Sequence, residues 1–230
     1  MNAEPNIAEV AALIGDPARA NILTALMDGR ALTASELAYR AHVTPQTTSH
    51  HLARLKLAAL IAEERQGRHR YYRLTGPEIG EILEKMIVVA VKSRPKPPRP
   101  DKAVDAIRRA RVCYDHLAGQ LGVELTQAMI ARRHLQRRDR DFHLTGAGER
   151  FVAGLGIELA AVRKQRRAFA RACLDWSERR PHLAGALGAA LAARLFELGW
   201  LRRTRDDRSV SLTEAGRSAL VERFAVTLAR

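Results

Sequence analysis

Two cysteines and two histidines are the residues of this sequence whose types and spacing suit metal or thiol chemistry. Cys113 precedes His116 by three residues, and Cys173 precedes His182 by nine. The three-residue spacing places the first pair on one face of a predicted helix. If the two segments meet about a pseudo-twofold axis, all four side chains gather in one place. Two thiolates with two imidazoles suit a soft or borderline metal ion such as Zn²⁺.

The same side chains have other interpretations. A thiol-reactive species such as an arsenical is a second candidate ligand, and two thiols can also act as a redox switch. Free cysteine is among the most buried residue types, so ordinary core packing is the plain alternative. In a further hypothesis, the Ala- and Leu-rich helices enclose an apolar pocket for a small organic ligand. The aromatic residues that would line such a pocket are Trp176, Trp200, Tyr114 and Phe169.

A second set of polar side chains suits the recognition of DNA bases. Thr33 to Leu74 reads as two short helices joined by a tight turn, followed by a basic hairpin with Gly67 at its tip. With Leu52 pointing inward, the second helix turns amide, hydroxyl, imidazole and guanidinium groups outward. These residues are Gln46, Thr47, His50 and Arg54, and the hairpin adds Arg65, Arg68, His69, Arg70 and Arg73. A solvated helix face is the alternative, but the basic hairpin favours a winged helix-turn-helix lying on DNA.

The helices that position this face carry clear start signals. Thr44 can cap the second helix, and Pro45 fits its first position, where no N–H is needed. The residues of this helix that we expect to point inward are Thr48, Leu52, Leu55 and Ala59. Upstream, the expected helices cover Ile7–Ile14, Pro17 to about Met27, and a stretch that starts near Ala34.

A strongly apolar helix is expected after the hairpin, from Pro77 to about Lys92. Its apolar residues at helical spacing are Ile79, Ile82, Leu83, Met86, Val89 and Ala90. A helix this apolar on so small a module needs a partner surface, so we interpret it as a dimerisation element packed with the first helix. Burial against the second half of the same chain is the alternative.

The domain organisation follows from a proline-rich stretch, SRPKPPRP, which reads as an extended linker. We expect a DNA-binding and dimerisation domain over residues 1–92, the linker over residues 93–100, and a C-terminal domain over residues 101–230. The C-terminal domain is the candidate sensor.

The C-terminal domain contains an internal repeat. HLAGQLGVEL at residues 116–125 matches HLAGALGAAL at residues 182–191, and each is followed by a basic, strand-like segment ending in LT-x-AG. Each copy is expected to fold as helix, helix, β-hairpin and helix. The fold class predicted for the chain is therefore mainly α with small β-wings: an N-terminal winged helix-turn-helix and a C-terminal domain of two winged-helix-like repeats.

Composition limits the classes of function. The 230-residue chain has a net charge of +14, which favours an acidic partner such as nucleic acid. A secretory signal and a membrane-length apolar run are both missing from the sequence, and the cysteine content indicates a reducing compartment. We therefore expect a cytoplasmic protein without a membrane partner. The sequence has no P-loop, dinucleotide-binding glycine run or HExxH motif, so we do not expect an enzyme.

Four motifs occur in order between Gly15 and Leu74: GDPARANILTALMDG, TASELA, VTPQTTSHHLARLKLAALI and ERQGRHRYYRL. By these motifs, residues 6–92 resemble the ArsR-type family of dimeric winged-helix repressors. The resemblance implies a homodimer on a palindromic operator in double-stranded DNA, with recognition helices in successive major grooves. By position, the implied DNA contacts are Gln46, Thr47, Ser49, His50 and Arg54 in the helix, and Arg68, His69, Arg70 and Tyr72 in the wing.

The familiar sensor positions of that family are vacant here. Family metal sensors often carry cysteines in the third helix, where this sequence reads ELAYRA from Glu36 to Ala41. Others place Asp and His ligands along the dimer helix, which has no histidine in this sequence. Any sensing is therefore expected in the C-terminal domain, at Cys113, His116, Cys173 and His182.

These observations predict a sequence-specific DNA-binding transcriptional regulator, a repressor by resemblance, whose operator binding is modulated through the C-terminal domain. The inducer is a metal ion or thiol-reactive ligand in one hypothesis and a small organic ligand in the other. An architectural DNA-binding protein is a further alternative, because high charge also suits binding without sequence preference. A footprint confined to one palindrome would favour the regulator over the architectural protein.

Overall fold

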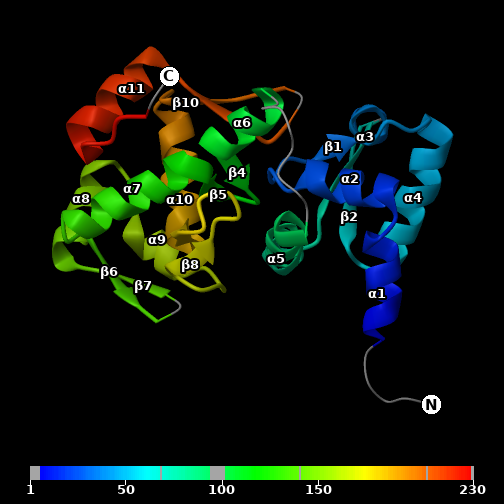
Figure 1. Ribbon diagram of the computed structural model, residues 1–230, viewed down its shortest axis with the longest axis horizontal. Coiled ribbons are helices and arrows are strands. Elements are labelled where there is room, and N and C mark those ends of the chain that lie inside the picture. The colour runs from blue at the N-terminus through cyan, green and yellow to red at the C-terminus, as the bar shows by residue number, and fades with distance from the viewer. Residues whose placement is uncertain (1–5, 68, 94–101, 140, 206, 229–230) are drawn as a thin grey trace. The chain divides into compact units, whose positions relative to one another are not determined.

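The computed structural model describes residues 6–67, 69–93, 102–139, 141–205 and 207–228 (Figure 1). The chain divides into two compact units, Met1–Met86 and Ile87–Arg230, and helices with short antiparallel strands make up both. Within the described ranges, no helix has the length and apolarity that crossing a membrane requires. Apart from Ser93, the expected linker lies outside the described residues.

The first unit is a winged helix-turn-helix. Its elements are α1 (Ile7–Ile14), α2 (Pro17–Leu26), β1 (Leu32–Thr33), α3 (Ala34–Ala41), α4 (Pro45–Leu57), β2 (Ile61–Gln66) and β3 (His69–Leu74), and α5 (Pro77–Ser93) follows across the unit boundary. The strands form one antiparallel sheet in the order β1–β3–β2, in which β2 and β3 are the wing. The expected helices and hairpin are therefore confirmed.

Side-chain caps explain where these helices begin. Asp16 caps α2 and Thr44 caps α4, each through an oxygen that accepts a backbone N–H, and Thr33 and Glu36 form a reciprocal capping box on α3. The apolar stripes meet in a core whose members are at most 2% exposed: Ile22, Leu23, Leu26, Leu37, Leu52 and Leu55. Ala59 was expected to point inward but is exposed, because α4 ends at Leu57 and Ala59 adopts a left-handed φ of 54°.

The second unit consists of two segments with the same order of elements. The first segment contains α6 (Lys102–Arg109), β4 (Arg111–Cys113), β5 (His116–Ala118), α7 (Gly119–Ala131), β6 (Leu135–Arg138), β7 (Asp141–Leu144) and α8 (Gly146–Gly154). The second segment contains α9 (Leu159–Arg163), β8 (Arg171–Leu174), β9 (Pro181–Ala184), α10 (Gly185–Glu197), β10 (Leu201–Arg203), β11 (Val210–Leu212) and α11 (Glu214–Ala219), with the π-helix η1 (Leu220–Phe224) at its end. The sheets are β4–β5, β6–β7–β8–β9 and β10–β11.

The HLAG stretches were expected to be helical, but the structure shows that each begins as a strand. Each forms the second strand of a pair, β5 or β9, and the helix starts only at the glycine that follows. Gly119 and Gly185 have φ of 74° and 77°, and a Cβ at either would lie 2.5 Å from a backbone oxygen. The expected plan therefore lacked a strand pair: the observed order is helix, strand pair, helix, hairpin and helix. The winged-helix-like interpretation of the two segments stays a prediction.

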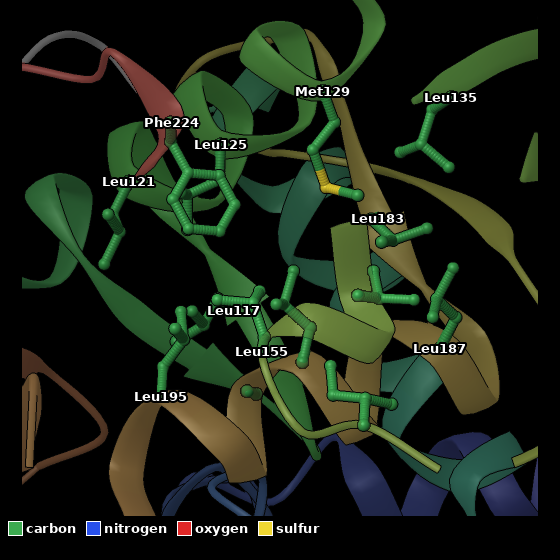
Figure 2. Close-up of a cluster of buried hydrophobic side chains, with 14 of the residues drawn as sticks. Leu117, Leu121, Leu125, Met129, Leu135, Leu155, Leu183, Leu187, Leu195 and Phe224 are labelled. Atoms are coloured by element: carbon green, nitrogen blue, oxygen red, sulfur yellow. The ribbon is translucent and has the colours of Figure 1, made fainter. Parts of the chain in front are cut away.

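The core of the second unit joins its two segments. Helix α7 packs against β9 and α10 packs against β5, so each helix covers a strand of the other segment. Figure 2 shows the apolar side chains that meet there, which include Leu121, Leu125 and Met129 of α7, Leu183 of β9, and Leu187 and Leu195 of α10. Because β5 and β9 are also in contact, this exchange brings the two strand pairs together.

Candidate functional site

Helix α4 has a buried face and a polar outer face. Thr48, Leu52 and Leu55 are at most 2% exposed. The predicted DNA-facing residues of the helix are all exposed: Gln46, Thr47, Ser49, His50 and Arg54. Two hydroxyls on this face already have partners, because Thr47 lies 2.9 Å from the Thr44 hydroxyl and Ser49 donates to the Pro45 carbonyl at 3.0 Å. The face offers amide, imidazole and guanidinium groups to a groove, and its contact with DNA stays a prediction.

A charge network links the end of α4 to the wing. Lys56 Nζ donates to Glu63 Oε2 at 2.6 Å, and Arg65 Nε donates to Glu63 Oε1 at 3.3 Å. These hydrogen bonds lower the pKa of Glu63. Arg70 Nε lies 3.8 Å from the same carboxylate. Sequence reasoning missed Lys56 and Glu63, although their opposite charges on either side of the turn were an available signal.

The wing residues differ in exposure. His69 and Arg70 are exposed, as a phosphate contact requires, and Arg68 lies outside the described residues. Tyr72 was expected in the wing contact but is 7% exposed. It lies in β3, the middle strand of the sheet, opposite Leu32, so it belongs to the core of the unit.

Four side chains of the second unit converge. Cys113 on β4 is paired across the strands with His116 on β5, and Cys173 on β8 is paired with His182 on β9. The sulfur and imidazole nitrogen atoms that could bind a ligand all lie within 4.8 Å of one another. We call these four residues the Cys–His cluster. The structure brings together the residues singled out from the sequence, and their sensing role stays a prediction.

The cluster is assembled differently from the expectation. Cys113 and His116 do not share a helix face; they oppose each other across a tight turn in which Tyr114 has a φ of 60°. Opposed residues of antiparallel strands have Cβ atoms about 4.5–5.5 Å apart, so each strand pair sets a cysteine beside a histidine. Contact between β5 and β9 then joins the two pairs.

The cluster is buried and reduced. Cys113, His116 and His182 are 2%, 5% and 0% exposed, Cys173 is partly exposed, and both cysteines are free of disulfides. The Nε2 atoms of both histidines are buried and have no hydrogen-bond partner among the described residues. Buried polar atoms without a partner are uncommon and call for an explanation.

Two aspartates flank the histidines. Asp115 Oδ1 lies 3.2 Å from His116 Nδ1, and Asp175 Oδ2 lies 3.5 Å from His182 Nδ1. Sequence reasoning gave these carboxylates no role. The available signal was their spacing, because each aspartate follows a cluster cysteine by two residues.

The pKa values of the two histidines are shifted in opposite directions. Burial disfavours the charged ring of His116, but the Cys113 thiolate and the Asp115 carboxylate outweigh it and raise the pKa of His116 to about 9. Burial, together with the neighbouring His116, holds the pKa of His182 well below its usual value, although Asp175 opposes that shift.

The donor set of the cluster suits a soft or borderline metal ion or a thiol-reactive ligand. Thiolates and neutral imidazoles are the protein ligands that zinc takes most often. Of the residues suggested for an organic-ligand pocket, Trp200 and Phe169 pack against the apolar core of the second unit. Trp176 lines a cavity of about 290 Å³ together with Val88, Val91 and Leu174, and the binding of an organic ligand there stays a prediction.

Comparison with known proteins gives matches to regulators. Residues 14–64 match a family model described as a helix-turn-helix domain. An uncharacterized HTH-type transcriptional regulator of Bacillus subtilis (strain 168), YdfF, is 43% identical over 224 residues, which cover 97% of this chain and 99% of that protein.

Two further relatives match over shorter stretches. The transcriptional repressor SdpR of Bacillus subtilis (strain 168) is 34% identical over 74 residues, 32% of this chain and 81% of that protein. The HTH-type transcriptional regulator KmtR of Mycobacterium tuberculosis (strain ATCC 25618 / H37Rv) is 28% identical over 102 residues, 44% of this chain and 78% of that protein. These relatives are transcriptional regulators and not enzymes.

Proposed function

Because this chain belongs to the ArsR-type family of helix-turn-helix transcriptional regulators, we propose that it is a repressor that binds a palindromic operator as a homodimer. A metal ion or thiol-reactive ligand that binds the Cys–His cluster lowers the affinity of the repressor for that operator. The DNA-binding part of the proposal follows from the family, and the sensing part follows from the cluster.

The surface of the first unit supports sequence-specific binding. Exposed Gln46, His50 and Arg54 carry groups that pair with base edges in a major groove. Exposed His69 and Arg70 on the wing suit flanking phosphates, which supply affinity without reading sequence. The chain's net charge of +14 adds to the attraction.

The apolar side of α5 supports a homodimer. Ile82, Met86 and Val89 are 46%, 43% and 64% exposed, and their spacing places them on one side of the helix. In α1, Ile7 is 81% and Val10 is 40% exposed. Exposed apolar surface on two helices is typical of a protein–protein interface.

One observation carries the sensing part: two thiols and two imidazoles lie within 4.8 Å of one another in a buried position. Such a set costs free energy unless a ligand satisfies it, because buried polar atoms lose their water. A ligand that binds it differently in the DNA-bound and free forms shifts operator affinity.

Operator binding and release test both parts with the full-length protein. Sequences selected from random duplexes are expected to contain one palindrome, with a footprint confined to it. Uniform coating of DNA would contradict the DNA-binding part. Zn²⁺, Cd²⁺ or phenylarsine oxide is then added to the complex. Release is expected for the wild type and for the control Glu158→Gln, whose exposed carboxylate makes no cap hydrogen bond.

The cysteine variants complete this experiment. Cys113→Ser and Cys173→Ser are expected to keep operator binding, because neither residue lies in the first unit, and to lose release by the effective ligand. Normal release from both variants would contradict the sensing part and leave the DNA-binding part intact.

A further inference from the structure

On both histidines of the Cys–His cluster, the two ring nitrogens have different surroundings. On each ring, Nε2 is buried and has no hydrogen-bond partner among the described residues. Nδ1 of His116 lies 3.2 Å from Asp115 Oδ1, within hydrogen-bond distance, and Nδ1 of His182 lies 3.5 Å from Asp175 Oδ2 but makes no hydrogen bond among the described residues. His116 therefore has the arrangement of a metal-binding histidine, whose second nitrogen contacts a carboxylate or carbonyl that fixes its tautomer, and His182 has a carboxylate placed for the same role.

The two carboxylates are themselves held in place. Asp115, in the first segment, is paired with Arg167 of the second segment, and the Arg167 Nη2 atom lies 3.4 Å from Asp115 Oδ1. Asp175, in the second segment, accepts a hydrogen bond from Arg111 of the first segment at 2.9 Å. Both outer ion pairs therefore cross between the segments, as the four cluster residues do.

Resting on the proposed metal or thiol chemistry of this cluster, we infer that it holds one divalent ion of the zinc class. Both thiolates and the Nε2 atoms of both histidines bind the ion. Asp115 and Asp175 are positioning residues that hold the Nδ1–H groups and so aim Nε2 at the ion.

The donor set decides the class of ion. Two sulfur and two nitrogen donors are diagnostic of a closed, four-ligand zinc-type site, which leaves no position for a reacting water. A divalent ion also cancels the charge of two thiolates, which a buried site requires. A trivalent arsenical binds sulfur, so it would leave both buried imidazoles without a partner.

The spacing of the donors fits this assignment. Zinc bonds of about 2.0–2.3 Å to nitrogen and sulfur put tetrahedral donors roughly 3.3–3.8 Å apart. One donor atom from each of the four residues lies within 4.8 Å of the others. Side-chain shifts of about 1 Å would therefore bring the most widely separated donors to the spacing of a tetrahedral zinc site.

Cobalt and zinc titrations of the metal-free full-length protein test the ion. One Co²⁺ per chain is expected, with sulfur-to-cobalt charge-transfer bands and the strong d–d bands of a tetrahedral site, and Zn²⁺ is expected to displace it. A chain that binds neither ion would overturn the inference. If phenylarsine oxide still releases the operator in that case, the proposed function stands through its thiol branch.

The variant Asp115→Asn tests the positioning role. It is expected to lower Zn²⁺ affinity by about 10–100-fold, while the Co²⁺ complex keeps its two-thiolate charge-transfer intensity because all four ligands are present. The control Glu158→Gln removes one exposed carboxylate from the same unit and is expected to bind Zn²⁺ as the wild type does. Wild-type Zn²⁺ affinity in Asp115→Asn would overturn the positioning role alone.

A measurement on the wild type keeps the inference testable if that variant does not fold. In a long-range ¹H–¹⁵N spectrum of the zinc-loaded protein, both cluster rings are expected to carry the proton on Nδ1 and the metal on Nε2. Coordination through Nδ1 of either histidine would overturn the assigned roles of Asp115 and Asp175.

Discussion

Arg111 and Asp175 form a fully buried ion pair in the second unit. Both side chains are 0% exposed, and Arg111 Nη2 donates to Asp175 Oδ2 at 2.9 Å. The same carboxylate accepts the Gly119 amide at 2.6 Å and the Ser177 hydroxyl at 2.7 Å. Burial opposes the charge, but Arg111 and the Ser177 hydrogen bond outweigh it and lower the pKa of Asp175 to about 2. The carboxylate is therefore ionised at neutral pH and depends on its arginine.

Replacement of that arginine is expected to destabilise the second unit. Arg111→Met leaves the Asp175 charge buried without its counter-ion, which costs about 3–5 kcal/mol of unfolding free energy. Urea unfolding followed by tryptophan fluorescence measures the loss, because both tryptophans, Trp176 and Trp200, lie in this unit.

The matched control for this prediction is Arg180→Met, which breaks an exposed ion pair with Glu124. Pairs on the surface contribute about 0–1 kcal/mol, so the control is expected to unfold at nearly the wild-type urea concentration. Equal effects of Arg111→Met and Arg180→Met would show that the buried pair does not hold the unit together.

At the scale of elements, local signals set the helices of the first unit. Asp16, Thr33 and Thr44 each cap the helix that follows, and proline opens two of those helices. Signals of this kind lie within a few residues, so the starts of α2, α3 and α4 were predictable from the sequence, whereas the end of α4 at Leu57 was not. The β4–β5 turn was not, because it places Tyr114 in a left-handed conformation that usually takes glycine or asparagine.

The cap of α3 makes a pH-dependent contribution to stability. The Glu36 carboxylate accepts hydrogen bonds from the Thr33 amide and hydroxyl, both at 2.8 Å, and these bonds lower the pKa of Glu36 from 4.5. Below that unfolded value the unfolded chain binds more protons than the folded chain. The stabilisation is therefore complete above it and is lost as the pH falls.

Glu36→Gln is the variant that tests this contribution. It keeps a side-chain acceptor but removes the negative charge from the first turn of α3, so it is expected to lower the unfolding free energy by about 0.3–1 kcal/mol at neutral pH. The difference from the wild type is expected to shrink as the pH falls below 4.5. Thermal unfolding followed by circular dichroism measures it, and a difference independent of pH would contradict this role of the carboxylate.

Substitutions in the recognition helix and in the wing are expected to affect DNA binding in different ways. Arg54→Ala on α4 removes a group that we propose reads base edges, so it is expected to cost about 1–3 kcal/mol on the operator and to relax specificity. Arg70→Ala on the wing removes a proposed phosphate contact, so it is expected to weaken binding to all sequences and to lower the salt slope by about 1. Equal losses of Arg54→Ala on operator and random DNA would contradict the reading role.

Helix α5 is expected to hold the dimer. Ile82→Asp places a charge in the exposed apolar face, so it is expected to give monomers that bind the operator weakly, because two half-sites can no longer be held one DNA turn apart. Glu158→Gln changes an exposed carboxylate outside this helix and is expected to stay dimeric. Light scattering distinguishes the two outcomes, and a dimeric Ile82→Asp would contradict the assignment of the interface.

At the scale of the whole molecule, the chain has its helix-turn-helix domain in one unit and its candidate ligand site in the other. The four residues of that site were identifiable from the sequence because they recur in matched copies. The strand pairs that assemble them were not, since they depend on contact between β5 and β9, which lie far apart in sequence. The outer carboxylates were missed for the same reason: their partners Arg167 and Arg111 come from the opposite segment.

In the proposed mechanism of regulation, ligand binding in the second unit is coupled to operator binding by the first unit. Ligand binding and operator binding must change each other's affinity by the same factor, and such factors are typically about 5–150. The proposed direction is release, so the ligand-bound form holds the operator less tightly than the free form does.

Operator affinity measured with and without metal tests this coupling. Fluorescence anisotropy of labelled operator DNA is recorded with the full-length protein, first metal-free and then with one Zn²⁺ per chain. Zn²⁺ is expected to weaken operator binding by about 5–150-fold, and Cys113→Ser is expected to abolish the change. The same operator affinity in the metal-free and zinc-loaded wild type would contradict the coupling.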